Sequence, residues 1–282
     1  NDEQVPPPKP EKRPEILRAE HVSFSYTPSR QVLKNLSFTI CEGEMVSVVG
    51  TNGAGKSTLA KAICGLVTGV EGTFYLSGEP ITGATIKERS QHIGFVMQNP
   101  NQMICKPMIY DEVALGLRLR GVPENENPDR VEQALVVCGL SPFRKWPISA
   151  LSFGQKKRVT IASVLALNPR VIILDEPTAG QDYRHYTYIM EFLRSLNASG
   201  VTIILITHDM HLMLEYTPHA IVLHDGCILH DGTAVEALTN RDIADRASLK
   251  ITSLYELAGL CHIENRQSFV QNFIDYERGH AR

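Results

Sequence analysis

The stretch VVGTNGAGKSTLAKAICGL, from Val48 to Leu66, constrains the fold more than any other part of the chain. It matches the pattern G-x-x-x-x-G-K-[ST], with an apolar run before it and a helical run after it. Gly50 allows a tight turn, and Gly53 and Gly55 let the backbone come close to a ligand. The loop amides then point inward at a helix N-terminus, where they form a site for anions. A glycine-rich turn without a ligand is the alternative, which the full pattern in this setting disfavours.

The polar residues of this loop suit phosphate groups and a divalent cation. Lys56 is predicted to reach the β- and γ-phosphates of a nucleotide and to act in catalysis. Ser57 is predicted to ligate Mg²⁺, and Thr58 to add a phosphate contact. Asn52, Gly53 and Gly55 belong to the same predicted binding loop. A nucleotide with β- and γ-phosphates and Mg²⁺ are therefore the expected ligands of this loop.

A pair of acids ends an apolar run in the stretch VIILDEPTAGQD, residues 171–182. Asp175 is predicted to hold Mg²⁺, directly or through water. Glu176 is predicted to polarise the attacking water as a general base. The alternative is a solvated strand end, which the phosphate loop elsewhere in the chain disfavours.

Apolar runs rich in β-branched residues alternate with helical patterns, as in a parallel α/β sheet. Runs 45–50, 171–176 and 201–207 are apolar almost throughout, which predicts strands buried on both faces. The runs HVSFSY and LSFTI alternate in polarity and predict an antiparallel flap near the N-terminus. The stretch HAIVLHDGCILHDG predicts a hairpin that turns at Asp225 and Gly226.

Helical patterns replace strands between about residues 100 and 166, which indicates a helical subdomain inserted in an α/β domain of residues 15–235. Residues 236–282 predict a helical extension. Within it, one face is expected to hold Ile251, Leu254, Tyr255, Ala258 and Cys261. Residues 1–14 are rich in proline and charge and predict an extended linker.

The composition argues against several classes of protein. The formal net charge of −3 gives no electrostatic case for binding nucleic acid. No apolar run approaches the roughly 20 residues that cross a bilayer, and no signal-peptide pattern is visible. The six cysteines are widely spaced without a C-x-x-C pair, which predicts reduced thiols packed as small apolar residues rather than disulfides or a zinc site.

Further polar features occur in a fixed order along the chain. Gln98 follows the run HIGFVMQ, the turn SFGQ covers residues 152–155, Asp182 ends TAGQD, and His208 lies in ILITHD. With the phosphate loop and the acid pair, this order resembles that of the ATP-binding-cassette (ABC) ATPases. In that family the motifs are Walker A, Q-loop, signature, Walker B, D-loop and H-loop.

The resemblance implies a head-to-tail pair of nucleotide domains with two ATP molecules between them. Each nucleotide would contact the Walker A loop of one domain and Ser152, Gly154 and Gln155 of the other. Asp182 would cross the interface, although the neighbouring Gln181 stands where the family usually has an apolar residue.

The same resemblance assigns three further residues. Gln98 would sense and ligate Mg²⁺, act in catalysis and link to the helical insertion. His208 would contact the γ-phosphate and the attacking water. Tyr26 matches the aromatic residue that stacks on adenine, with a core position as the alternative.

The SFGQ turn also has a purely local interpretation. Ser152 and Gln155 are three residues apart before a helical run, which is the pattern of a capping box. The first-turn amides would then face an anion, and Phe153 would have an ordinary helical φ that it tolerates. Lys156, Lys157 and Arg158 oppose the helix dipole there and are predicted to lie near phosphates or an acidic partner. A simple capped helix is the alternative.

A narrower resemblance begins at Gln98. The stretch QNPNQMICKPMIYDEVALGLRLRGV is similar to the equivalent segment in ATPases of energy-coupling-factor (ECF) importers, which take up vitamins and transition-metal ions. It predicts a helix that exposes Val113 and Leu117 where a membrane subunit docks; packing inside the helical insertion is the alternative. The stretch ITSLYELAGL is similar to the tail through which ECF ATPases pair.

We therefore expect the ATP-hydrolysing subunit of an ECF-type importer of a vitamin, vitamin precursor or metal ion. The chain, which begins at Asn1, is expected to be a full subunit or an excised half of a tandem one. A conventional ABC importer ATPase and a soluble, non-transport ABC ATPase are the alternatives. The expected partners are a second ABC ATPase domain, an integral membrane coupling subunit and a substrate-binding membrane subunit, without nucleic acid. The expected location is peripheral, at the cytoplasmic face of the cell membrane.

Overall fold

The computed structural model of the chain describes residues 13–178 and 183–280. Its elements are, in chain order, β1 (Glu15–Thr27), β2 (Arg30–Cys41), β3 (Met45–Gly50), α1 (Lys56–Ile63), β4 (Glu71–Leu76), β5 (Glu79–Pro80), α2 (Ile86–Arg89), β6 (Ile93–Val96), η1 (Pro100–Gln102), α3 (Ile109–Leu119), α4 (Asn127–Val137), η2 (Ser141–Phe143), η3 (Ile148–Ala150), α5 (Phe153–Leu165), β7 (Val171–Asp175), α6 (Tyr183–Ala198), β8 (Thr202–Ile206), α7 (Met210–Tyr216), β9 (His219–His224), β10 (Cys227–Thr233), α8 (Ala234–Thr239), α9 (Arg241–Ala247), α10 (Ser253–Leu260) and α11 (Arg266–His280).

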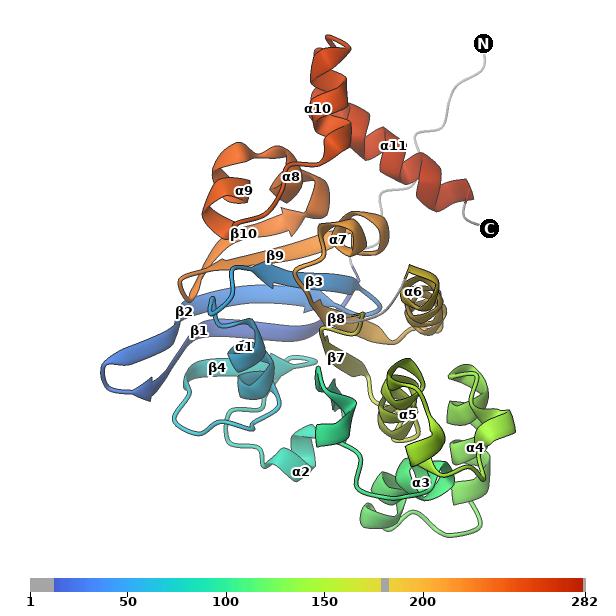
Figure 1. Cartoon of the computed structure of the whole chain (residues 1–282). Helices are drawn as coiled ribbons and strands as arrows, with labels where there is room; N and C mark the ends of the chain where they lie inside the picture. The colour runs from blue at the N-terminus through green and yellow to red at the C-terminus, as the bar shows by residue number, and fades with distance from the viewer. Residues whose placement is uncertain (1–12, 179–182, 281–282) are drawn as a thin grey trace, which may run out of the picture.

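Two sheets organise these elements (Figure 1). One is antiparallel, in the order β2-β1-β4-β5, and the other has the order β10-β9-β3-β8-β7-β6. In the second sheet β6, β7, β8, β3 and β9 run parallel, and β10 joins β9 as an antiparallel hairpin. The predicted α/β fold with an antiparallel β subdomain, a helical insertion and a helical C-terminal extension is confirmed. The division of the chain after residues 14 and 235 stays a prediction.

The parallel strands are buried on both faces, as their continuous apolar sequences predict. All six residues of β3 are buried. Along β7, Val171 and Ile173 pack with the antiparallel sheet and α1, whereas Ile172 and Leu174 pack with α3, α5 and α6. The alternation follows from the period of two in a strand. The parallel sheet is thus the central layer, and its carboxyl edge is held in place from both sides.

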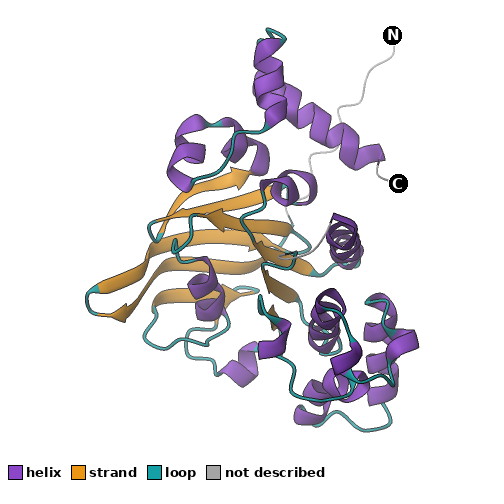
Figure 2. Ribbon diagram, viewed as in Figure 1, coloured by secondary structure: helices purple, strands orange, loops and turns teal. Residues whose placement is uncertain are grey.

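The helical region between β6 and β7 contains α3, α4 and α5, which lie together away from the antiparallel sheet (Figure 2). Val113 and Leu117 are fully buried among these helices. The prediction that they are exposed for a membrane subunit is therefore wrong. Their spacing of four residues places them on one helical face, and that face packs against α4 and α5 rather than towards solvent. The exposed apolar residue of α3 is Leu119, at its C-terminal end.

The C-terminal helices α10 and α11 pack on each other, and α11 packs on α8, at the opposite end of the molecule from α4 (Figure 1). Ala258 is fully buried in this contact, and Leu254 and Tyr255 pack at its edge. Ile251 precedes α10 and Cys261 follows it as the exposed C-cap, so the helical face predicted from Ile251 to Cys261 is shorter than expected. Among the described residues, no helix combines the length and the apolar character needed to cross a membrane.

Of the cysteines, two are buried, three are exposed, and Cys41 is partly exposed. Cys64 and Cys138 are buried among apolar residues, and burial raises the pKa of the Cys64 thiol to about 12. Cys105, Cys227 and Cys261 are exposed, so the prediction that the cysteines pack as small apolar residues is wrong for these three. They lie in a loop, at the start of an edge strand and at a helix C-cap, positions that face solvent in this fold.

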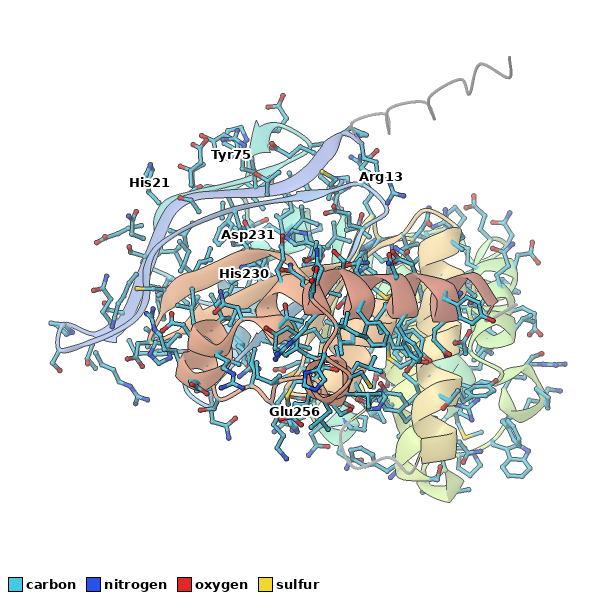
Figure 3. All side chains as sticks on the ribbon, turned by 90° about the horizontal axis from the view of Figure 1, so that it is seen from above. Arg13, His21, Tyr75, His230, Asp231 and Glu256 are labelled. Atoms are coloured by element: carbon cyan, nitrogen blue, oxygen red, sulfur yellow. The ribbon has the colours of Figure 1, made fainter. Side chains whose placement is uncertain are left out.

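An ionic cluster joins the β9–β10 hairpin to Glu44, the residue that precedes β3. His219 on β9 contacts Asp231 on β10, with 2.6 Å between Nε2 and Oδ1, and Glu44, with 3.5 Å between Nδ1 and Oε2. Figure 3 labels Asp231 at its place on β10. Burial disfavours the charged imidazole, but the two carboxylates outweigh this and raise the pKa of His219 to about 9.

The cluster predicts a pH-dependent stability. Because the folded pKa is raised, the stabilisation by His219 is fully present below pH 6.5 and is lost as the pH rises through about 9. We expect a loss on the order of 2 kcal/mol in the free energy of unfolding over this window. Urea denaturation of the wild-type chain and of His219→Gln at pH 6 and pH 10 measures it. The variant should show a smaller decline, and equal declines would contradict the assignment.

Candidate functional site

The loop between β3 and α1 is closed by glycines in conformations that other residues avoid. The φ angles of Gly50, Gly53 and Gly55 are 140°, 84° and 104°. A Cβ at Gly50 would overlap the carbonyl oxygen of Leu223, and one at Gly55 would lie 3.0 Å from the carbonyl oxygen of Val32. Gly55 is also the N-cap of α1 and supplies no side-chain cap. The first amides of α1 therefore lack a side-chain acceptor from the N-cap and suit an anion.

A cavity of about 570 Å³ lies over this loop and gathers most of the predicted site residues. Those that line it are Tyr26, Asn52, Gly53, Gly55, Lys56, Ser57, Thr58, Gln98, Asp175, Glu176 and His208. Ser152, Gly154 and Gln155 are not among the described residues that line it. Asp182 and Gln181 lie outside the described residues.

Lys56 bends back over its own loop. Its Nζ donates hydrogen bonds to the carbonyl oxygens of Gly50, at 2.8 Å, and Thr51, at 2.9 Å. Burial lowers the pKa of this ammonium, while the carboxylates of Glu176 and Asp175 oppose the shift. The Lys56 ammonium is thus held beside the loop, in the lining of the cavity where an anion would bind.

The donor set in the cavity fits Mg²⁺. The hydroxyl of Ser57, the amide of Gln98 and the carboxylate of Asp175 all line the same cavity as the phosphate loop. Hard cations such as Mg²⁺ prefer oxygen ligands, and Mg²⁺ usually takes one or two carboxylates together with substrate phosphates. These three residues could hold the ion beside a bound nucleotide.

Glu176 and His208 form a polar pair in the cavity. His208 Nδ1 lies 2.7 Å from Glu176 Oε1, within hydrogen-bonding distance. The carboxylate side chain is 12% exposed and the imidazole 70% exposed. Glu176 also has a φ of 47°, which is uncommon for a residue other than glycine. Such outliers gather at functional sites, because the surrounding structure must hold them in place.

Tyr26 stands at the edge of the cavity and is half exposed. Its ring meets Phe24 edge-on, with centroids 4.8 Å apart, and its hydroxyl lies 3.4 Å from Thr58 Oγ1. The alternative of a core aromatic does not fit this exposure. The ring has a free area on which a flat ligand could stack.

The SFGQ turn has the predicted capping box. The backbone N–H of Gln155 donates to Ser152 Oγ at 3.3 Å, and the backbone N–H of Ser152 donates to Gln155 Oε1 at 2.9 Å. Gly154 is buried, whereas Ser152 and Phe153 are exposed at the start of α5. Phe153 thus lies on the surface at the first position of α5.

The prediction for the three cations after this turn is wrong for Lys157. Its side chain is only 1% exposed, and its Nζ donates to the carbonyl oxygens of Met97, Gln98 and Asp175. Arg158 donates to the carbonyl oxygen of Cys138 at 3.0 Å and lies over the ring of Tyr188. Both side chains turn inward because backbone carbonyls at the ends of nearby elements need donors.

Several residues of the cavity were missed by sequence reasoning. They come from β2, from the end of β8 and from the β9–β10 turn, and are Arg30, Gln31, Val32, Lys34, Ile206, Asp225 and Gly226. The turn itself was predicted, but its contact with β2 was not. The amide of Lys34 donates to the carbonyl oxygen of Gly226 at 2.8 Å, which brings the two segments together. No local pattern encodes this contact.

The site agrees with the relatives that this chain matches. An ABC transporter ATP-binding protein of Clostridium perfringens is 59% identical over 264 residues, which cover 94% of this chain and 46% of the relative. Another, from Enterococcus faecalis, is 57% identical over 265 residues, which cover 94% of this chain and 47% of the relative. The chain thus spans about half the length of these curated relatives.

Solved structures share the fold. The structure of cbiO1 from Clostridium perfringens, part of the ABC transporter complex cbiONQ, has a TM-score of 0.76 and 32% identity over 89% of this chain and 100% of that one. An ATP-binding cassette of an ABC transporter in its ADP conformation has a TM-score of 0.73 and 25% identity, over 82% of this chain and 97% of that one.

The family model described as ABC transporter matches residues 33–179, from β2 through the acid pair. This range contains the phosphate loop, Gln98, the SFGQ turn and Asp175, which are four of the features on which the resemblance was based. By this match and by its relatives, the chain belongs to the ABC transporter family as an ATP-binding cassette.

Proposed function

We propose that this cassette hydrolyses ATP and drives an ECF-type importer of a vitamin, vitamin precursor or metal ion. The observation that carries hydrolysis is the Glu176–His208 pair, 2.7 Å apart in the cavity that the phosphate loop opens into. A phosphate site alone supports binding, whereas a positioned carboxylate adds a base for water. A soluble ABC ATPase without a transport role is less consistent with the relatives, which are named as transporter proteins.

The cavity residues divide the work of binding and hydrolysis. The amides of the loop and the Lys56 ammonium bind the phosphates, and Tyr26 stacks on the adenine ring. Ser57, Gln98 and Asp175 would hold Mg²⁺, which when bound neutralises charge on the phosphate oxygens. Glu176 accepts a proton from the attacking water, and His208, in contact with Glu176, orients that carboxylate and approaches the γ-phosphate. Nothing in this assignment requires covalent chemistry with the protein.

The SFGQ turn serves a second cassette in this proposal. Ser152, Gly154 and Gln155 lie at the start of α5, outside the lining of the cavity in their own chain. Their first-turn amides suit an anion, so a nucleotide bound by another cassette is a fitting occupant. The pair is a homodimer, a heterodimer or two halves of one tandem chain, and the double length of the relatives supports the tandem arrangement. Asp182 would cross the same interface.

Transport requires membrane partners that this chain does not supply from its described residues. We propose an integral membrane coupling subunit and a substrate-binding membrane subunit, with the cassette at the cytoplasmic face. The relationship to cbiO1, which is part of a transporter complex, supports such partners. The segment QNPNQMI, residues 98–104, favours the ECF type over a conventional importer. The mildly acidic net charge of −3 does not favour nucleic acid as a partner.

Hydrolysis is tested by Glu176→Gln. The amide keeps the shape and a hydrogen bond to His208 but cannot accept the proton, so we expect kcat to fall about 100-fold or more. The affinity for ATP, measured with a fluorescent analogue, should stay within about threefold of the wild type. Lys56→Ala is the matched comparison, because it should weaken ATP binding itself by about 10- to 100-fold through loss of a charged hydrogen bond. Turnover by Glu176→Gln at the wild-type rate would remove the base assignment.

The transport proposal is tested in membranes. When the full-length protein that contains this chain is affinity-purified from detergent-solubilised membranes of its source cells, an integral membrane subunit should co-purify in defined stoichiometry. Mass spectrometry identifies that subunit and, through it, the transported substrate. Recovery from the membrane fraction without any integral membrane protein would contradict the transport proposal while leaving ATP hydrolysis intact.

A further inference from the structure

Lys157 is a buried cation that the mechanism above does not use. It lies in the second turn of α5, five residues after Ser152, and its side chain is 1% exposed. Its Nζ donates to the carbonyl oxygens of Met97 at 2.7 Å, Gln98 at 2.9 Å and Asp175 at 3.3 Å. An ammonium has three donors, so these carbonyls satisfy all of them.

Stability alone explains this arrangement poorly. Burying an ammonium is costly, and a well-packed apolar side chain often stabilises a core equally well. Burial lowers the pKa of Lys157 to about 8, although the carboxylates of Asp175 and Glu176 partly oppose the shift. The carbonyls belong to Met97, Gln98 and Asp175, and two of these residues carry proposed Mg²⁺ ligands. This suggests that Lys157 positions the backbone of the site.

The three acceptors come from two strand ends at the site. Met97 and Gln98 directly follow β6, and Asp175 is the last residue of β7. The side chains of Gln98 and Asp175 line the cavity, whereas Lys157 is not among the described residues that do so. The Lys157 ammonium therefore binds the backbones of two proposed Mg²⁺ ligands on the side away from the cavity lining. Lys157 belongs to α5, the helix that begins at the SFGQ turn.

The segment that follows β6, residues 97–106, is also held at its C-terminal end by a buried charged side chain. Glu112 on α3 is 5% exposed, and its Oε2 accepts from the amides of Cys105 at 2.8 Å and Lys106 at 2.7 Å. Helices α3 and α5 pack on each other. Residues 97–106 are thus held at both ends by buried charged side chains of the helical region, and Lys157 is the one that holds the end at the cavity.

We propose that Lys157 is a positioning residue that links the backbones of Gln98 and Asp175 to α5, so that the Mg²⁺ side of one nucleotide site is coupled to the SFGQ turn offered to the second site. The inference rests on the proposed function. A displacement of the start of α5 larger than the lysine stem can follow would lengthen or break these hydrogen bonds. The positions of the two halves of the shared site are thereby coupled within each chain.

The first test is kinetic and uses Lys157→Met, which removes the ammonium and keeps most of the aliphatic stem. We expect kcat to fall tenfold or more with an ATP affinity within threefold of the wild type. Lys145→Met, which changes an exposed lysine of the same helical region, is the control and should retain wild-type kcat. If the methionine variant does not fold, Lys157→Gln, which keeps two donors, takes its place. Wild-type kcat in a folded Lys157 variant would overturn the proposal.

A double-mutant cycle separates positioning from stability. Gln98→Ala removes the side chain that Lys157 is proposed to place, so Lys157→Met should reduce kcat much less in the Gln98→Ala background than in the wild type. A purely structural lysine predicts that the two reductions multiply. Multiplicative reductions would therefore overturn the positioning role.

Hydrogen–deuterium exchange tests the tether without any turnover. In Lys157→Met, deuterium uptake should rise together in peptides that cover residues 97–104, 152–158 and 175–178, and remain unchanged in β3. Unchanged uptake in these three segments would overturn the tether. If the wild-type chain binds ATP but does not hydrolyse it, the proposed function fails, and the exchange result still decides whether Lys157 joins these segments.

Discussion

The curvature of the loop between β3 and α1 is the constraint on which the rest of the site depends. Gly50 passes so close to Leu223 on β9 that a side chain would overlap its carbonyl oxygen. Only a residue without a Cβ can make this turn between a buried central strand and a helix. Because β7 and β8 run parallel to β3, their carboxyl ends lie at the same edge, and they deliver Glu176 and His208 to the loop. The chemistry of the cavity thus follows from one glycine turn and a parallel sheet.

Much of this site could be predicted because its signals are local. The loop pattern, the acids after an apolar run and the Ser152–Gln155 capping box each lie within a short stretch of sequence, and the backbone geometry they require is fixed by neighbouring residues. The buried strands could be read from continuous apolar sequence for the same reason. The resemblance to ABC ATPases then predicted that these features form one site, and most of the predicted residues line one cavity.

Other features could not be predicted, since they depend on contacts distant in sequence. The spacing of Val113 and Leu117 defines a helical face but not whether solvent or another helix covers it. Lys157 stands in a run of three cations, a pattern typical of an exposed helix, and only the strand ends 60 and 18 residues away draw it inward. The contact of the β9–β10 turn with Lys34 of β2 arises in the same way.

The cavity holds one half of the proposed active site, and the SFGQ turn of the same chain faces elsewhere. The most direct test of this central claim is the specific ATPase activity of the purified chain as a function of its concentration in the presence of Mg²⁺. A site shared between two cassettes predicts activity per chain that rises with concentration and levels off as pairs form. Activity per chain that is constant down to the lowest measurable concentration, with the chain monomeric by light scattering, would show a complete site within one cassette and contradict the account.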